Sequence, residues 1–243
     1  MDYAASSFAR AVKYLKLHFA HKFIRICCCL PGTGYRNVAE LGQSLEFSFW
    51  LIREFKQKSP VFATRDKLWN CMISYLARDA KITVFEFGVA YGHATKWWLA
   101  HCRSIDSYYG FDTFRGLSRP WRHFSAGAFS ANGNPPEIGD PRVDWMIGRV
   151  EDTVSGEIIE KLSCRTDGKK QCVFIFDLDL FEPTKHVLEQ VIPQLKEGDL
   201  LYFDEAADWD ERRALMEVMG ELPVSLQLVG STPIAMALRV VTG

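Results

Sequence analysis

The sequence predicts an α/β fold built on a doubly wound, mostly parallel sheet of seven strands. From residue 81 onward, short apolar runs alternate with helical segments, the order that produces a parallel sheet covered on both faces. The runs at 82–87 and 172–176 are almost continuously apolar, as expected of buried central strands. The last two runs, 225–229 and 234–240, are joined by Gly230-Ser231-Thr232-Pro233, which predicts an antiparallel hairpin at the sheet edge.

Composition sets the broad class. The 243 residues, 48% hydrophobic and 24% charged, suit one α/β domain with appended helices. The formal net charge of −1 gives no basic field, so we do not expect nucleic-acid binding. No run is long and apolar enough to span a bilayer, and no secretory signal is present. The seven cysteines lack the spacing of a disulfide framework, which favours reduced thiols in a cytoplasmic protein.

Residues 1–80 are predicted to form a helical extension. Residues 5–30 alternate basic and apolar side chains at helical spacing. We expect this helix to pack on the domain or on a second subunit of a homo-oligomer; a membrane-surface helix is the alternative. Pro31-Gly32-Thr33-Gly34 predicts a chain break, followed by helices at 38–58 and 65–78.

The domain at 81–243 begins with a strand, a glycine-containing turn and a helix. The strand at 82–87 is followed by Gly88 and Gly92, and a helix is expected over 93–101. In an open α/β sheet, this first strand-to-helix turn is the usual ligand crevice. The spacing is not G-x-G-x-x-G, which argues against a dinucleotide-dependent oxidoreductase. An ordinary strand–turn–helix is the alternative interpretation.

The second strand, 105–111, ends in Asp112. An acidic residue here, about 20 residues past the glycine turn, is placed to accept hydrogen bonds from ribose hydroxyls. A helix N-cap is the other role open to it. The segment 116–144 has no clear periodicity and contains Trp121, His123 and Phe129, so we predict an aromatic lid over a substrate site.

Four carboxylates follow the next strands. A short strand at 144–147 precedes a helix ending near residue 163; the strand at 172–176 leads to Asp177 and Asp179, then to a helix ending near 195. The strand at 200–203 leads to Asp204 and Glu205, then to a helix at 208–219. Carboxylates that converge at neighbouring strand ends repel one another unless a cation or shared protons intervene. They predict a site for Mg²⁺ or for acid/base chemistry, with helix capping as the alternative.

Four stretches, in this order, resemble the class I S-adenosylmethionine (SAM)-dependent methyltransferases, and more narrowly the macrocin O-methyltransferase-like family. They are residues 86–92 (EFGVAYG), 110–117 (GFDTFRGL), 177–184 (DLDLFEPT) and 203–205 (FDE). The match extends from about residue 82 to the end of the chain and implies a Rossmann-like fold. The cofactor-binding residues that the resemblance implies are Glu86, Gly88, Tyr91, Gly92, Asp112, Thr113, Gly148, Arg149 and Val150.

The resemblance also implies a reaction. SAM would methylate a hydroxyl of a small molecule, such as the sugar moiety of a natural product, a glycan or a glycolipid. Asp177, Asp204 and Glu205 would bind Mg²⁺, and Asp179 would be the general base. This chain has Asp-Leu-Asp and Asp-Glu where the family usually has Asp-Gly-Asp and Asp-Asp. A SAM-binding protein without activity, acting through its basic N-terminal helix at a partner or membrane, is the competing hypothesis.

Overall fold

The computed structural model describes residues 32–56, 59–163, 170–220 and 224–241. The chain divides into two units, 1–46 and 47–243, and helix α2 (Gly32–Phe55) crosses the boundary between them. The basic segment predicted to be helical at 5–30 lies outside the described residues. The break predicted at 31–34 is wrong for its last three residues, because Gly32, Thr33 and Gly34 lie in the first turn of α2.

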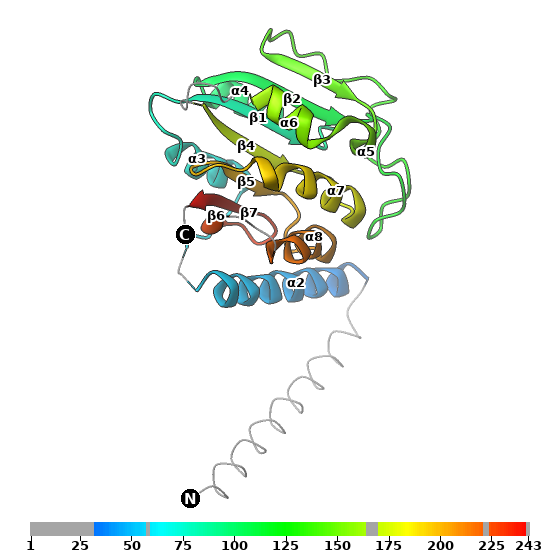
Figure 1. The fold of residues 1–243 in the computed structure, drawn as a ribbon. Coiled ribbons are helices and arrows are strands. Elements are labelled where there is room, and N and C mark those ends of the chain that lie inside the picture. Colours follow the sequence, from blue (N-terminus) through cyan, green and yellow to red (C-terminus); the bar gives the residue numbers. More distant parts are fainter. Residues whose placement is uncertain (1–31, 57–58, 164–169, 221–223, 242–243) are drawn as a thin grey trace, which may run out of the picture. The chain divides into compact units, whose positions relative to one another are not determined.

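A seven-stranded sheet organises the second unit, and its strand order is β3-β2-β1-β4-β5-β7-β6 (Figure 1). The strands are β1 (Lys81–Phe87), β2 (Ile105–Asp112), β3 (Val143–Ile147), β4 (Lys170–Phe176), β5 (Leu200–Phe203), β6 (Ser225–Ser231) and β7 (Met236–Val241). The first five pair in parallel, whereas β7 pairs antiparallel with both β5 and β6. The predicted fold class, including the antiparallel C-terminal hairpin, is therefore confirmed.

Alternate side chains of each central strand enter two separate cores, as the two-residue period of a strand requires. Phe85 of β1 stacks on Phe174 of β4 at 5.2 Å between ring centroids in one core. Helices α5 (Val150–Thr153), α6 (Gly156–Ser163), α7 (Phe181–Val191) and α8 (Trp209–Met219) cover this core together with residues 47–55 of α2. The other core holds Val84 and is covered by α3 (Arg65–Ser74) and α4 (His93–His101).

Two predicted helices are interrupted. The helix expected to reach residue 163 is split into α5 and α6, because Val154 adopts an extended conformation between them. The helix expected to reach residue 195 ends at Val191 and continues as a 3₁₀ turn, Ile192–Gln194. Pro193 lies in that turn, and its missing N–H cannot continue an α-helical ladder.

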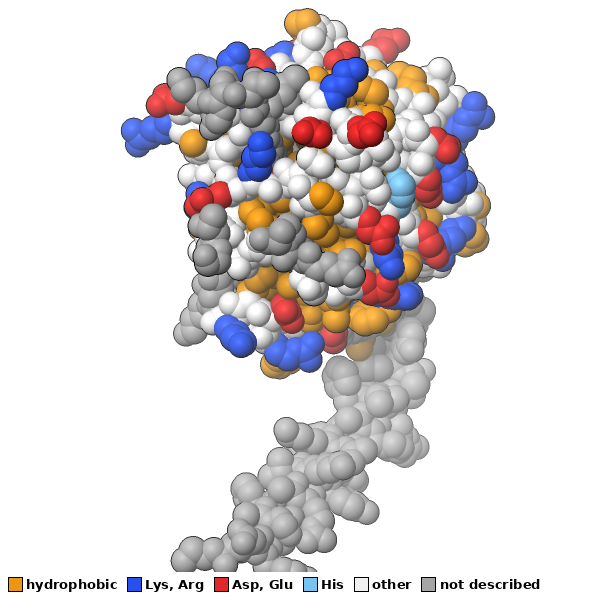
Figure 2. All heavy atoms as spheres, in the orientation of Figure 1, with side chains coloured by type: hydrophobic (Ala, Val, Ile, Leu, Met, Phe, Trp, Pro, Cys, Tyr) orange, Lys and Arg blue, Asp and Glu red, His pale blue; other side chains and the backbone are white. Residues whose placement is uncertain are grey.

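The described surface is mixed in charge. On the face drawn in Figure 2, acidic and basic side chains are interspersed, which agrees with the net charge of −1. Among the helices of the described residues, none has the length and apolar character to cross a membrane.

Candidate active site

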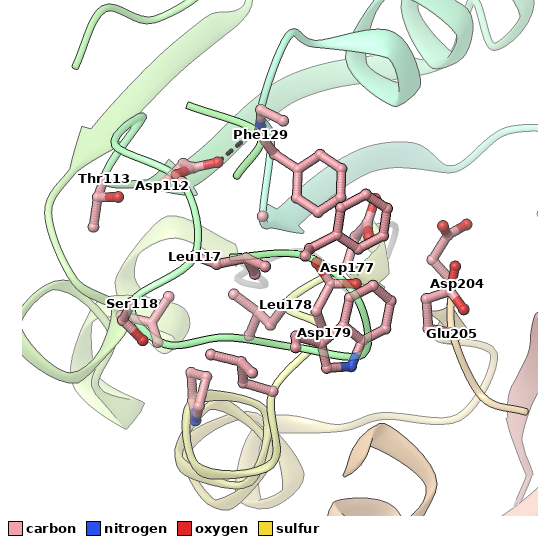
Figure 3. Close-up of a pocket in the computed structure, with 18 of the residues that line it drawn as sticks. Asp112, Thr113, Leu117, Ser118, Phe129, Asp177, Leu178, Asp179, Asp204 and Glu205 are labelled. Carbon is pink, nitrogen blue, oxygen red and sulfur yellow. Dashed lines mark hydrogen bonds between the residues drawn. The ribbon is translucent and has the colours of Figure 1, made fainter. Parts of the chain in front are cut away.

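A cavity of about 530 Å³ opens at the carboxyl ends of β1, β2, β4 and β5. The chain order of the strands reverses between β1 and β4, and ligands of open α/β sheets bind at such a switch point. Figure 3 shows Asp112 and Thr113 at one end of the cavity and Asp204 and Glu205 at the other, with Asp177 and Asp179 between them. The topology therefore brings six of the nine predicted cofactor residues and all four predicted carboxylates into one cavity.

Gly88 lines the cavity where β1 and β4 end side by side. Its φ of +88° is rarely adopted by other residues, and a Cβ atom there would lie 1.8 Å from the carbonyl oxygen of Asp177. Its N–H donates to the carbonyl of Phe111 in β2 at 3.0 Å. Only glycine fits between these strand ends, and the absence of a side chain at this position leaves space at the floor of the cavity.

Asp112 organises the turn that follows Gly88. Its Oδ2 accepts the N–H groups of Val89 and Ala90, each at 2.8 Å, and its Oδ1 accepts that of Phe114 at 2.7 Å. A carboxylate has about four acceptor positions, so the side chain keeps capacity for a further donor from the cavity it lines. Asp112 caps no helix, and the capping alternative does not hold.

Three predicted cofactor residues do not line the cavity: Glu86, Tyr91 and Gly92. Glu86 is 1% exposed and accepts hydrogen bonds from the Tyr108 hydroxyl at 2.7 Å and from the Thr95 hydroxyl. Burial, opposed by these two bonds, raises the pKa of Glu86 to about 8. Glu86 thus lies beneath the turn as a buried hydrogen-bond acceptor, while Tyr91 is 59% exposed and donates to the carbonyl of Ser130.

All four predicted carboxylates line the cavity. Burial, followed by repulsion from Asp204, raises the pKa of Asp177 well above its usual value. Burial and the charges of Glu205 and Asp204, opposed by Arg122, raise the pKa of Asp179 to about 7. The pKa of Glu205 is likewise raised to about 7, by burial against the opposing effect of Arg122.

The capping alternative fails for these carboxylates too. The N-cap of α7 is Leu180, and no side chain caps that helix. The N-cap of α8 is Asp208, which accepts the N–H of Asp210 at 3.1 Å. Neither N-cap is one of the four predicted carboxylates, so helix capping does not explain why acidic residues occupy these strand ends.

Glu211, in the first turn of α8, supports the carboxylate end of the cavity and was not predicted from the sequence. It is fully buried; its Oε1 accepts the N–H groups of Leu178 and Asp179, each at 3.3 Å, and its Oε2 accepts that of Glu205 at 3.0 Å. Asp179 has a φ of +61°, a strained conformation that these bonds support. One side chain therefore joins the loops after β4 and β5. The available signal, an acidic residue three places after an N-cap, is also what any helix start shows.

The predicted lid is a folded segment between β2 and β3, and we call its residues 116–142 the aromatic segment. Backbone hydrogen bonds close it on itself, from Leu117 to Ala128 at 2.9 Å and from Gly127 back to Leu117 at 2.8 Å. Its aromatic side chains line the cavity and pack on one another, with Phe124 in contact with the rings of Trp121, His123 and Phe129. The end of the predicted segment, 143–144, belongs to β3.

Gly148, Arg149 and Val150 line the cavity between β3 and α5. They lie beside Asp112, because the N–H of Gly148 donates to the Asp112 carbonyl at 3.1 Å and Asp112 pairs with Ile147 between β2 and β3. Thirteen predicted site residues thus share the cavity: Gly88, Asp112, Thr113, Trp121, His123, Phe129, Gly148, Arg149, Val150, Asp177, Asp179, Asp204 and Glu205.

Comparison with known proteins gives matches among solved structures alone. No protein-family model and no curated protein matches the chain. The chain is similar to the calicheamicin methyltransferase CalS11, with 22% identity, a TM-score of 0.51, and coverage of 82% of this chain and 91% of that one. It is also similar to an apo structure of CalS11, described as a TDP-rhamnose 3′-O-methyltransferase of calicheamicin biosynthesis (21% identity, 86% and 95% coverage, TM-score 0.47). A third match is the O-methyltransferase NovP (16% identity, 72% and 79% coverage, TM-score 0.48).

The first of these similarities, together with the strand order and the antiparallel hairpin, identifies the architecture. The described sheet has the Rossmann-like fold of the class I SAM-dependent methyltransferases.

Proposed function

We propose that this chain is a SAM-dependent O-methyltransferase acting on a hydroxyl of a small molecule. One observation carries the proposal: a single cavity joins a glycine turn and an acidic β2 end to a cluster of carboxylates beneath aromatic rings. The part of the cavity formed by the glycine turn and Asp112 suits a nucleoside cofactor. The part formed by the carboxylates and the aromatic rings suits an acceptor whose hydroxyl must lose a proton.

The Asp112 side of the cavity is the proposed cofactor site. The remaining acceptor capacity of Asp112 would receive a ribose hydroxyl, with Thr113 beside it. The residues 148–150 would border the adenine, and Gly88 leaves space for the methionine part. Glu86, Tyr91 and Gly92 would act from outside the cavity, by shaping the turn.

Asp179 is the proposed general base. It lies between the two parts of the cavity, and a pKa of about 7 matches a base that works near neutral pH. SAM supplies an electrophilic methyl group on a sulfonium. Asp179 would accept the proton of the acceptor hydroxyl as that oxygen is methylated.

Mg²⁺, which the sequence resemblance implies on Asp177, Asp204 and Glu205, does not fit the donors as they lie. The Oδ1 of Asp204 accepts from the Tyr202 hydroxyl and its Oδ2 pairs with Arg65, while Glu205 pairs with Arg122. Within the described residues, no three carboxylate, histidine or cysteine side chains are grouped as metal ligands. The proposed reaction therefore has no step at a metal ion.

The acceptor is proposed to carry several hydroxyls, as a sugar moiety of a natural product, a glycan or a glycolipid does. Trp121, Phe124 and Phe129 offer apolar ring surfaces beside carboxylates that accept hydroxyl hydrogen bonds. A cytoplasmic location and a homo-oligomer remain predictions. The alternative, a SAM-binding protein without activity that acts through its N-terminal helix, concerns residues outside those described.

The test is turnover on a panel of glycosides, nucleotide sugars and phenols, with S-adenosylhomocysteine formation as the readout. Asp179→Asn should bind S-adenosylhomocysteine as the wild type does but lose at least about 100-fold in turnover, the usual contribution of a general base. Equal turnover by wild type and variant would contradict the assignment of the base. Tight S-adenosylhomocysteine binding without turnover of any panel member would favour the binding-protein alternative.

A further inference from the structure

Two arginines, Arg65 and Arg122, line the cavity at its carboxylate end. Nη2 of Arg65 lies 3.0 Å from Oδ2 of Asp204, whose side chain is 5% exposed. Nη2 of Arg122 lies 3.0 Å from Oε2 of Glu205, and its Nε lies 2.7 Å from Oδ2 of Asp208. Each of the two strand-end acidic residues after β5 therefore already has a cationic partner.

The two guanidinium groups come from different parts of the fold. Arg65 is the first residue of α3, which packs against the sheet face opposite α7 and α8. Arg122 belongs to the aromatic segment between β2 and β3; its guanidinium carbon lies 4.3 Å from the ring centre of Trp121, a cation–π distance. One arginine thus belongs to a helix packed on the sheet, whereas the other belongs to the segment whose aromatic rings line the cavity.

These pairs occupy the carboxylates after β5, two of the three predicted metal ligands. Both oxygens of Asp204 are engaged, since its Oδ1 accepts the hydroxyl hydrogen of buried Tyr202. Mg²⁺ requires carboxylate oxygens in near-octahedral geometry and sheds its waters reluctantly. To bind here it would have to displace an arginine that is always charged and forms strong hydrogen bonds with carboxylates.

We propose that Arg65 and Arg122 are the resident cations of this site, so that the protein excludes divalent metal ions and positions the acceptor with guanidinium groups instead. The proposal rests on the proposed function for the acceptor's identity, but not for the exclusion of metal. Arg65 is a positioning residue: it holds Asp204 through one N–H donor, and its other donors are available to an acceptor oxygen in the cavity that it lines. Arg122 neutralises Glu205 and, because it belongs to the aromatic segment, also holds that segment against the end of β5.

The experiment measures binding of Mn²⁺ alone, by electron paramagnetic resonance, in the absence of cofactor and acceptor. The sharp signal of aqueous Mn²⁺ should persist in equimolar wild-type protein. Arg65→Met keeps most of the apolar stem but removes the charge, leaving Asp204 beside Asp177 without its counter-ion. This variant should gain at least about tenfold in Mn²⁺ affinity, because the unbalanced carboxylates then attract a hard cation.

Arg122→Met provides a second variant, which should gain Mn²⁺ affinity through Glu205. The matched control is Arg119→Met, on the same segment, whose partners Glu182 and Asp210 lie outside the cavity lining. It should behave as the wild type. Circular dichroism and S-adenosylhomocysteine titration accompany each variant, so that loss of folding or failure of the cofactor assignment is seen separately.

Two results would overturn the proposal. The first is stoichiometric binding of Mn²⁺ by the wild type, which would mean that the ion displaces the arginines. The second is a folded Arg65→Met variant and a folded Arg122→Met variant that both bind Mn²⁺ no better than the wild type. Mn²⁺ affinity gained by either variant, with none in the wild type or the Arg119→Met control, supports it.

Discussion

The substitution Glu86→Gln tests whether Glu86 is a buried structural acid or a residue that contacts the cofactor. Glu86 is inaccessible beneath the glycine turn and accepts hydrogen bonds from Tyr108 and Thr95. Because burial raises its pKa to about 8, the carboxyl is mostly protonated in the folded protein at neutral pH. Glutamine has nearly the same shape as the protonated acid but cannot titrate.

The magnitude follows from proton linkage. A folded-state pKa of about 8, against 4.5 for the free side chain, means that the folded protein holds this proton more tightly than the unfolded chain. The stabilisation is present in full below the unfolded pKa and is lost as the pH rises through the folded pKa. Between about pH 5.5 and about pH 8, the wild type should lose about 3 kcal/mol of unfolding free energy relative to Glu86→Gln.

The assay is urea unfolding of both proteins across that pH range. Other titrating carboxyls, including Asp179 and Glu205, are present in both proteins, so their contributions cancel in the difference. A difference that stays constant with pH would refute the buried-acid account of Glu86. S-adenosylhomocysteine affinity should be nearly equal in the two proteins near neutral pH, and a large loss in the variant would instead indicate a direct cofactor contact.

Three further substitutions test the cavity framework. Gly88→Ala should lower the unfolding free energy by more than about 2 kcal/mol, through its positive φ and the collision with the β4 end, whereas Gly139→Ala, with no atom within 4 Å of the new Cβ, should change it little; urea titration distinguishes them. Asp112→Asn should cost about 1–3 kcal/mol, because an NH₂ group replaces an acceptor of backbone N–H groups, and an unchanged urea midpoint would contradict that role. Glu211→Ala should cost at least about 2 kcal/mol by orphaning three N–H groups, while Glu217→Ala, exposed on the same helix, should leave thermal stability almost unchanged.

The fold could be predicted because its signals are local. Continuous apolar runs mark the buried strands β1 and β4, and Gly88 marks the turn between a strand and a helix. Strand ends in a parallel sheet share one edge, which is why Asp177 and Asp204 could be predicted from the sequence to lie close together. The helix interruption at Val154 was missed because no proline or glycine occupies that position.

The chemistry of the site was less predictable because it depends on contacts between residues distant in sequence. Arg65 and Asp204 are separated in the sequence by the first five strands of the sheet, yet they form an ion pair at 3.0 Å. Arg122 reaches Glu205 from a segment without regular structure, and Glu211 meets two loops from inside a helix. Nothing in the spacing of a carboxylate indicates whether its partner will be a metal ion, an arginine or a backbone N–H.

Hydrogen exchange with and without S-adenosylhomocysteine tests the central claim, cofactor binding at the switch point, most directly. Binding at the Asp112 side should slow exchange of the amides at 88–90, 113–114 and 148–150, because these backbone segments surround the proposed site. The edge hairpin of β6 and β7, which does not line the cavity, should be far less affected. Unchanged exchange around Gly88 and Gly148 at saturating S-adenosylhomocysteine, or protection confined to other segments, would contradict the account.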